Sequence, residues 1–324
     1  MMPFVSVIVT TYNQAAYIEE ALRSACEQTY PHKEVIVVDD GSSDETPDRI
    51  RAFSDRVIYL CQRNQGIAAS RNAGIRRASG DLIAFLDGDD VWEPEKLAVQ
   101  VAAVERHPDS GLIVVDGVQF SEAGVLQEWL IGTPGREWLG RGESAIVATR
   151  CYAALAQGCF ISTMSQVMVP RRVLDTVGLS DPRFKLCSDY DLYMRIAARY
   201  EVTFVGRRLV RWRYTPTSAS GPEEVRRLRW LEDSIPVWQK QLREASSAED
   251  RAVVQQALAA GARKAAQGGY YYGRAVDRWW TTAYLVRILR KSRMPRTVVP
   301  FLMGLWLPHA VTSRIGPMVR RRVR

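Results

Sequence analysis

The stretch Leu82-Ile83-Ala84-Phe85-Leu86-Asp87-Gly88-Asp89-Asp90 decides how this chain of 324 residues is interpreted. Its first five residues are apolar, which is typical of a strand buried on both faces of a sheet. Three carboxylates follow on one short turn, where their charges repel one another. A hard divalent cation relieves such repulsion, and an all-oxygen ligand set suits Mg²⁺ or Mn²⁺ better than zinc. The spacing also fits a solvated acidic turn before the helix that begins near Pro94.

Apolar runs of similar length alternate with amphipathic stretches along much of the chain. We expect strands at residues 5–9, 34–38, 57–60, 82–86 and 112–115, and near Val202 and Leu209. Between the first two strands, Ile18, Leu22 and Ala25 have the spacing of one helix face. This alternation predicts an α/β fold with a mostly parallel, twisted sheet and helices on both faces. In such a fold, ligands bind at the carboxyl ends of the strands.

Polar segments follow three of these strands directly, at Thr10-Thr11-Tyr12-Asn13, Asp39-Asp40-Gly41-Ser42 and Asp87-Gly88-Asp89-Asp90. We expect the three segments to converge on one edge of the sheet. There Asp40 could accept hydrogen bonds from a nucleobase or a ribose, although aspartate also favours turns. Arg71, on a predicted helix, could bind phosphate oxygens in a bidentate way, whereas an exposed helix arginine is the simpler interpretation.

A further acidic segment, Ser188-Asp189-Tyr190-Asp191, opens a predicted helix. An aspartate at a helix start can cap the helix and also face a binding site. A carboxylate that faces such a site can act as a general base when it lies within ~3 Å of a reacting hydroxyl, and Asp189 is a candidate for that role. Spacing alone leaves open the simpler interpretation, a cap plus an exposed aspartate.

The chain divides near residues 215–222, where proline, serine and glycine cluster. We therefore expect a catalytic domain over residues 1–220 and a helical, basic domain over residues 221–324. Residues 117–160 are rich in glycine and tryptophan and have weak periodicity. We interpret them as loops that shape an acceptor cleft.

The five cysteines are odd in number, scattered and without a Cys-x-x-Cys pair. This pattern argues against a disulfide framework and a zinc ribbon, and it suits a reducing cytoplasm. The apolar start, Val5-Ser6-Val7-Ile8-Val9, is too short for a signal peptide. Apolar runs also stay below the ~20 residues that a spanning helix needs. We therefore expect a cytoplasmic location.

The positive charge lies at one end of the chain. Residues 274–324 contain twelve arginines and lysines and one acid, a net charge of +11 against +8 for the whole chain. Apolar and aromatic groups lie among them: Trp279, Trp280, Tyr284, Leu285 and residues 301–307. This combination predicts peripheral attachment to an anionic membrane surface, while a helical core with a basic rim or a partner subunit is the alternative. No nucleic-acid partner is expected despite the isoelectric point of about 9.3, because the aromatic residues lie in long aliphatic runs.

Six motifs occur in order within residues 3–215: residues 5–13, residues 38–44, Asn64-Gln65-Gly66, Arg71-Asn72, Asp87-Gly88-Asp89-Asp90 and Ser188-Asp189-Tyr190-Asp191-Leu192. As a set they closely resemble glycosyltransferase family 2, far more specifically than any one of them alone. The resemblance implies a GT-A fold and an inverting enzyme that moves a sugar from a nucleotide diphosphate to an acceptor hydroxyl. It also implies a glycan or lipid-linked acceptor and favours uridine, with guanosine and thymidine open.

The same resemblance implies roles for individual residues. Thr11, Tyr12 and Asp40 would hold the nucleoside, with Asp40 at the base. Arg71 would contact the base or the diphosphate.

The resemblance also implies a metal site and a base. Asp87 and Asp89 match the family's Asp-x-Asp motif, with Asp89 the principal ligand of Mn²⁺ or Mg²⁺ and Asp87 nearer the ribose. Asp90 is a secondary metal candidate. Asp189 would be the catalytic base.

Two positions depart from the family pattern. Ser188 stands where glutamate is common, and Thr215 ends a segment that often ends in histidine. In some members that histidine contributes to the metal site, whereas the histidines of this chain, His32, His107 and His309, lie in other segments. A third protein ligand to the metal is therefore not assigned.

Two other functions are compatible with the acidic segments. A receiver-like, Mg²⁺-dependent phosphoryl-transfer protein would gather Asp39, Asp40 and Asp87, but the chain is too long for a lone receiver and has no Walker lysine loop. A catalytically inactive nucleotide-sugar binder would not need the acids at positions 89 and 189. The sequence does not specify the sugar, the acceptor, the linkage or the oligomeric state.

Overall fold

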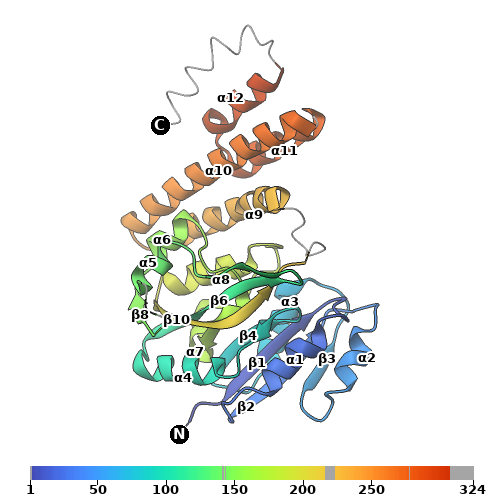
Figure 1. Cartoon of the computed structure of the whole chain (residues 1–324). Helices are drawn as coiled ribbons and strands as arrows, with labels where there is room; N and C mark the ends of the chain where they lie inside the picture. The colour runs from blue at the N-terminus through green and yellow to red at the C-terminus, as the bar shows by residue number, and fades with distance from the viewer. Residues whose placement is uncertain (1, 141, 143, 216–222, 277, 307–324) are drawn as a thin grey trace. The chain divides into compact units, whose positions relative to one another are not determined.

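The computed structural model describes residues 2–140, 142, 144–215, 223–276 and 278–306 (Figure 1). Contacts within the chain divide it into two compact units, residues 1–218 and 219–324. The first unit combines a sheet with helices, and the described part of the second unit is helical.

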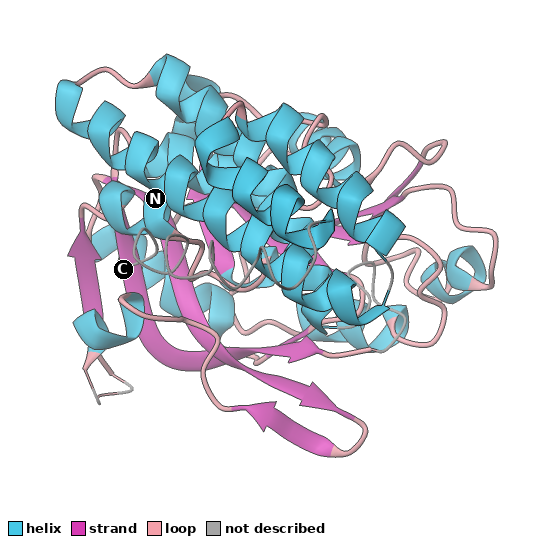
Figure 2. Ribbon diagram, turned by 90° about the horizontal axis from the view of Figure 1, so that it is seen from above, coloured by secondary structure: helices cyan, strands magenta, loops and turns pink. Residues whose placement is uncertain are grey.

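The strands of the first unit form one sheet (magenta in Figure 2). They are β1 (Val5–Thr11), β2 (Lys33–Asp39), β3 (Ile58–Cys61), β4 (Leu82–Asp87), β5 (Val91–Trp92), β6 (Ser110–Ser121), β7 (Gly124–Gln127), β8 (Ile146–Thr149), β9 (Val167–Pro170) and β10 (Glu201–Arg213). The order is β3-β2-β1-β4-β9-β6-β10-β5, with β7 beside β6 and β8 beside β10. The first four strands of this order are mutually parallel, as are β6 and β10, whereas β9 runs antiparallel between β4 and β6.

Helices cover both faces of this sheet, which confirms the predicted α/β class. They are α1 (Ile18–Cys26), α2 (Thr46–Arg51), α3 (Ile67–Arg77), α4 (Lys96–Arg106), α5 (Gly135–Leu139), α6 (Tyr152–Gln157), the 3₁₀ turn η1 (Met164–Gln166), α7 (Arg171–Val177) and α8 (Ser188–Ala197). Val7 and Val9 of β1 belong to one buried cluster with Leu22 of α1 and Leu97 of α4. Ile8 points to the opposite face, as the alternation of a strand requires, and meets α3 there.

Helix α3 approaches β1 closely at Gly74. A Cβ atom at this position would lie 2.4 Å from Cγ2 of Ile8, so a larger residue would push the helix away from the sheet. Ala68 and Ile75 of α3 are buried, whereas Ile67 at the start of the helix is 39% exposed. This close packing of α3 on β1 determines how far the polar residues of α3, such as Arg71, lie from the edge of the sheet.

Residues 117–160 are more regular than the loops that the sequence predicts. They contain the end of β6, the strands β7 and β8, and the short helices α5 and α6. Gly117 interrupts the apolar pattern from which the sequence would predict a continuing strand. Glycine is required there because a Cβ atom would lie 2.3 Å from the carbonyl oxygen of Val210. The two strands expected near Val202 and Leu209 are one long strand, β10, whose pairing with β6 is irregular after Val205.

The second unit contains α9 (Glu223–Glu244), α10 (Ala248–Val276), α11 (Arg278–Ser292) and α12 (Pro295–Trp306). Tyr284 and Leu285 are buried in its core, and the hydroxyl of Tyr284 donates a hydrogen bond to the carbonyl of Leu228 at 3.1 Å. Their prediction as membrane-facing groups is therefore wrong, because a helix turns each residue by about 100° and α11 directs these two inward. Trp279 is 73% exposed.

Part of the predicted membrane surface lies outside the described residues. This applies to the side chain of Trp280, to the side chains of residues 303–306 and to the whole of residues 307–324. Phe301 is buried. Within the described part of the chain, every helix is too short or too polar to span a bilayer.

Candidate active site

The carboxyl ends of β1, β2 and β4 meet at one edge of the sheet, as expected for parallel neighbours. Thr10 pairs with Asp87 across β1 and β4, and Thr11 pairs with Asp39 across β1 and β2. The amide of Asp40 donates to the carbonyl of Thr11 at 2.9 Å. The three polar segments identified in the sequence therefore share one edge.

Asp87 ends β4 and connects several parts of this edge. Its Oδ1 accepts a hydrogen bond from Nη2 of Arg71 at 2.8 Å, and its Oδ2 accepts one from Thr163 at 3.3 Å. The backbone amide of Asp87 donates to Oγ of Ser165 at 3.0 Å. The carboxylate is 22% exposed, so it is held by the protein while it still reaches the surface of the site.

Asp90 is buried, and its hydrogen bonds hold the acidic turn in place. Its Oδ2 accepts hydrogen bonds from Ser165 at 2.6 Å and Thr163 at 3.2 Å, and its Oδ1 accepts the amide of Arg213 at 3.0 Å. Burial raises its pKa, and the charges of Asp89 and Asp87 add to the shift. Asp90 is 1% exposed and its two oxygens already accept three protein donors, so it is less accessible to a metal than Asp87, whose side chain is 22% exposed. Its assignment as a metal ligand stays a prediction.

Asp89 lies between these two residues and is partly exposed. Burial, together with the charge of Asp87, raises its pKa to about 6, while a hydrogen bond from Gln14 and the charge of Arg213 oppose the shift. Two carboxylates that destabilise each other's charge, with only oxygen donors, fit Mg²⁺ or Mn²⁺. No preformed cluster of three or more His, Cys, Asp or Glu ligands occurs among the described residues.

Arg71 is buried on α3, so the interpretation as an exposed helix arginine is wrong. Burial alone would lower its pKa, but the charges of Asp87 and Asp189 raise it. Its Nε is buried and has no hydrogen-bond partner among the described residues. Arg71 thus lies within electrostatic range of both acids and keeps one donor unused, which a phosphate or hydroxyl oxygen could accept.

Asp40 is buried and organises the loop that precedes α3. Its oxygens accept hydrogen bonds from Gln62 Nε2 at 2.7 Å, from the amide of Gln65 at 2.9 Å and from the amide of Gly66 at 2.7 Å. Gly66 has a φ of +88°, a conformation that favours glycine. The carboxylate therefore holds this loop in place, with at most one acceptor position left for a donor from a ligand.

The other two residues predicted at the nucleoside differ in exposure. Thr11 is buried, and its hydroxyl bonds to Oε1 of Gln14 at 2.9 Å. Tyr12 is 49% exposed, and its ring is available for stacking on a planar base. The hydroxyl of Thr11 is therefore already engaged by Gln14, whereas the ring of Tyr12 is accessible to a ligand.

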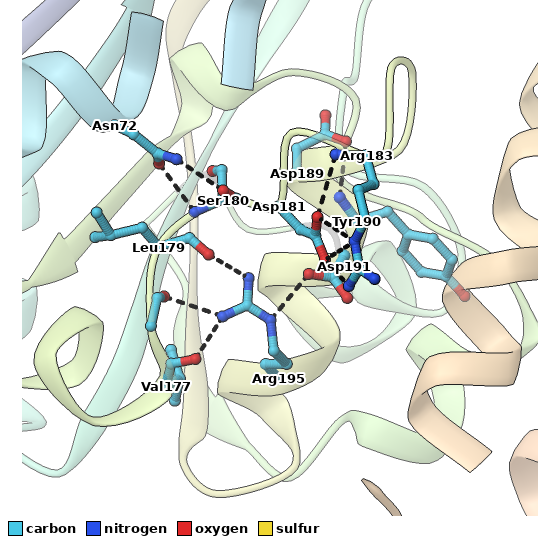
Figure 3. Close-up of polar contacts among 11 residues, drawn as sticks. Asn72, Val177, Leu179, Ser180, Asp181, Arg183, Asp189, Tyr190, Asp191 and Arg195 are labelled. Carbon is cyan, nitrogen blue, oxygen red and sulfur yellow. Dashed lines mark hydrogen bonds and ion pairs between the residues drawn. The ribbon is translucent and has the colours of Figure 1, made fainter. Parts of the chain in front are cut away.

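Asp189 lies in the first turn of α8, one residue after the helix begins (Figure 3). Its Oδ1 accepts the amide of Tyr190 at 2.7 Å. Burial raises the pKa of Asp189, and the charge of Arg71 opposes the shift. A half-buried carboxylate with a raised pKa is a stronger base than an exposed aspartate.

Several supporting residues were not singled out in the sequence. Thr163 and Gln166 form a reciprocal capping box around η1, which presents the Ser165 hydroxyl to the acidic turn. The Thr-x-x-Gln spacing was a usable signal for this turn. Gln62 and Arg213 carried no such signal, because their partners lie 22 and 123 positions away in the chain.

The fold matches solved glycosyltransferase structures. A fragment of S. aureus TarS in complex with UDP-GlcNAc superposes with a TM-score of 0.63 at 18% identity, covering 97% of this chain and 92% of that one. The mannosyltransferase PcManGT of Pyrobaculum calidifontis, in complex with GDP-mannose and Mn²⁺, gives a TM-score of 0.55 at 20% identity, covering 90% of this chain and 88% of that one. These likenesses confirm the predicted GT-A fold.

Curated relatives match by sequence. An uncharacterized glycosyltransferase of Rickettsia prowazekii is 30% identical over 193 residues, which covers 60% of this chain and 58% of that protein. A Bacillus subtilis protein whose name assigns it to teichuronic acid biosynthesis is 42% identical over 104 residues, 31% of this chain and 41% of that protein. The model of the family "Glycosyl transferase family 2" matches residues 6–176, more than half of the chain and nearly the whole sheet edge described above. The chain therefore belongs to glycosyl transferase family 2, as its six ordered motifs predict.

Proposed function

We propose that this protein is a metal-dependent, inverting glycosyltransferase that moves a sugar from a nucleotide diphosphate, with uridine favoured, to an acceptor hydroxyl. The observation that carries the proposal is the position of Arg71. Its buried guanidinium is bonded to Asp87 and lies within electrostatic range of Asp189. One cation thus links the acid turn expected at the diphosphate to the acid expected at the acceptor.

The donor would occupy the edge formed by β1, β2 and β4. The exposed ring of Tyr12 would stack on the base, beside Asp40 and Thr11. Complexes of solved relatives with UDP-GlcNAc and with GDP-mannose and Mn²⁺ support a nucleotide-sugar donor and a divalent metal. Asp89 would be the principal metal ligand and Asp87 a second ligand. When bound, the metal would neutralise charge on the departing nucleotide diphosphate.

Asp189 would take the proton of the acceptor hydroxyl. As that oxygen bonds to the anomeric carbon, the bond from this carbon to the diphosphate oxygen breaks, and the nucleotide diphosphate leaves from the opposite side. A single displacement of this kind inverts the configuration. Arg71 would hold the ionised form of Asp189 in place before the reaction, because its charge lowers the pKa of that carboxyl.

The acceptor is proposed at the level of its class, a glycan, polysaccharide or lipid-linked sugar. The Bacillus subtilis relative, whose name refers to teichuronic acid biosynthesis, supports this class. We assign catalysis to residues 1–220. Residues 221–324 are proposed to attach the enzyme to an anionic membrane surface on the cytoplasmic side, supported by exposed Trp279 and by the net charge of residues 274–324.

A panel of nucleotide sugars tests the donor and the metal together. We expect a UDP-sugar to raise the melting temperature more with Mn²⁺ than with a chelator present, because a ligand that binds only the folded state stabilises it. Release of nucleotide diphosphate on addition of acceptor would distinguish an enzyme from an inactive sugar-nucleotide binder. Labelling of an aspartate by acetyl phosphate, without any response to nucleotide sugars, would favour the receiver-like function and overturn the proposal.

A further inference from the structure

A short segment, residues 177–180, comprises the last residue of α7 and the loop that follows, and it is bonded both to the helix that carries Arg71 and to the helix that carries Asp189 (Figure 3). On one side it meets Asn72 of α3. Nδ2 of Asn72 donates to the carbonyl of Ser180 at 2.8 Å, and the amide of Ser180 donates to Oδ1 of Asn72 at 3.0 Å. Both polar atoms of the Asn72 side chain are therefore engaged by the backbone of one residue.

On its other side the loop meets Arg195 of α8. Nη1 of Arg195 donates to the carbonyls of Val177 at 2.5 Å and Gly178 at 3.0 Å, and Nη2 donates to the carbonyl of Leu179 at 2.8 Å. Nε of Arg195 donates to Asp191, on the preceding turn of the same helix, at 2.9 Å. One guanidinium thus binds three successive carbonyls, which a lysine ammonium cannot match in geometry.

The backbone turn at Gly178 makes this convergence possible. Helix α7 ends at Val177, and Gly178 follows with a φ of +82°, a left-handed conformation that favours glycine. The amide of Gly178 closes the helix on Leu174 at 2.8 Å, while the carbonyls at the end of the helix turn toward Arg195. An arginine that satisfies the last carbonyls of a helix replaces water there.

The bonds between Asn72 and Ser180 are buried, so they are costly to break, whereas the bonds from Arg195 are part-buried to Val177 and Leu179 and exposed at Gly178. Asn72 is 7% exposed and Ser180 is 3% exposed, and both bonds between them are buried. Removing one partner leaves a buried donor or acceptor without a bond, which costs more than the net contribution of an ordinary surface hydrogen bond. The loop therefore acts as a rigid spacer between α3 and α8.

We propose that Asn72 and Arg195 are positioning residues that set Asp189 relative to Arg71 and the donor edge. Asn72 is adjacent to Arg71 on α3, and Arg195 shares α8 with Asp189, so hydrogen bonds of this segment connect the two helices. This inference rests on the proposed role of Asp189 as the base. A misplacement of about 1 Å at a reacting centre can cost on the order of 10²-fold in rate, so loosening this spacer should affect turnover.

The test uses the full chain and the variants Asn72→Ala and Arg195→Lys, the second of which keeps a positive charge beside buried Asp191. We expect turnover to fall by about tenfold or more, with affinity for UDP and Mn²⁺ unchanged within about twofold. Arg199→Ala is the matched control. Arg199 also donates to a backbone carbonyl, that of Thr176 at 3.3 Å, but on the surface and outside residues 177–180. This control should leave turnover unchanged.

A double-mutant cycle identifies whether the effect passes through Asp189. If Asn72 and Arg195 act by positioning this carboxylate, their substitution should have little further effect on the residual turnover of Asp189→Asn. Losses that multiply in that background would overturn the inference while leaving Asp189 as the base. Loss of UDP affinity in step with turnover would overturn it as well, because it would indicate general damage to the donor edge. Normal turnover of Asp189→Asn itself would instead refute the proposed base and, with it, this role of the spacer.

Discussion

The sheet edge and the helical unit bury different kinds of side chain. The sequence predicts the environment of the charged residues at the edge better than that of the aromatic residues in the helical unit. At the edge, the buried or half-buried charges of Arg71, Asp87 and Asp90 each have partners from other elements. In the helical unit, large aromatic rings occupy space that glycine leaves open. A Cβ atom on Gly269 would lie 2.3 Å from the ring of Tyr284, and one on Gly261 would lie 2.0 Å from that of Trp238.

The difference reflects how many environments each residue type tolerates. A run of aspartates after an apolar strand has few stable environments, because buried carboxylates need donors, cations or a metal. Aromatic residues among arginines suit a protein core, a partner surface and a membrane interface alike. The predictions below test whether the two regions are as different in function as they are in composition.

The largest effect is expected at Asp189. Asp189→Asn should lower turnover by on the order of 10²- to 10⁴-fold while donor affinity is kept, because an amide cannot take the acceptor proton. Steady-state kinetics and calorimetry measure the two quantities. Asp175→Asn, an exposed carboxylate on α7, is the control and should be neutral. Near-normal turnover of Asp189→Asn would move the role of base to another acid.

The second effect is on stability and concerns the helical unit. Tyr284→Ala should destabilise this unit by about 3–5 kcal/mol, as expected for the loss of a buried aromatic side chain and its hydrogen bond. Trp279→Ala removes an exposed ring from the same helix and should change stability by about 0.5 kcal/mol or less. Urea unfolding monitored by circular dichroism compares them. Equal stability of the two variants would contradict the core position of Tyr284.

The third effect concerns the metal. Asp89→Ala should weaken donor binding by about tenfold or more, on the order of 1.4 kcal/mol, and abolish its dependence on Mn²⁺. Asp109→Ala removes an exposed acid far along the chain from the turn and serves as the control. Titration of UDP with and without Mn²⁺ measures both. An unchanged Mn²⁺ dependence in Asp89→Ala would refute this metal assignment.

The fourth effect is on the pH profile. The charge of Arg71 lowers the pKa of Asp189, so Arg71→Met should raise that pKa further. A base is active when deprotonated, and activity is lost as the pH falls through its pKa. The acid limb of kcat should therefore move to higher pH. Arg76→Met, an exposed change on the same helix, should leave the limb in place.

The smallest effect is expected on membrane attachment. The protein should co-sediment with anionic vesicles at low salt and be released as salt rises, because each basic group contributes about 1 kcal/mol and is screened over ~8 Å at physiological salt. Trp279→Ala should weaken attachment several-fold, or about 1 kcal/mol, and deletion of residues 295–324 should weaken it more. Attachment that survives this deletion, or no attachment at low salt, would assign the basic end another role.

Much of the fold could be predicted from residue order alone. Apolar runs that alternate with helical stretches predicted the α/β class, and the polar residues after β1, β2 and β4 predicted that these strand ends share one edge. The strand boundaries were predicted less well where a glycine interrupts the apolar pattern or where strand pairing is irregular. Gly117 hid the continuation of β6, and the irregular pairing after Val205 made one strand, β10, look like two.

The sequence by itself determined the chemistry available: carboxylates at strand ends, an arginine on the following helix and an acid at the start of another. These are local properties, set by residue type and by the periods of helix and strand. Only the tertiary structure decided which of them are buried, which are bonded to each other and which face outward. In the folded chain Tyr284 is buried in the core of the helical unit, and Asp90 accepts hydrogen bonds from Ser165 and Arg213. Asn72 and Arg195 are connected through their hydrogen bonds to residues 177–180. Such contacts join residues far apart in the chain, and burial is a property of the whole packed unit, so no local pattern encodes them.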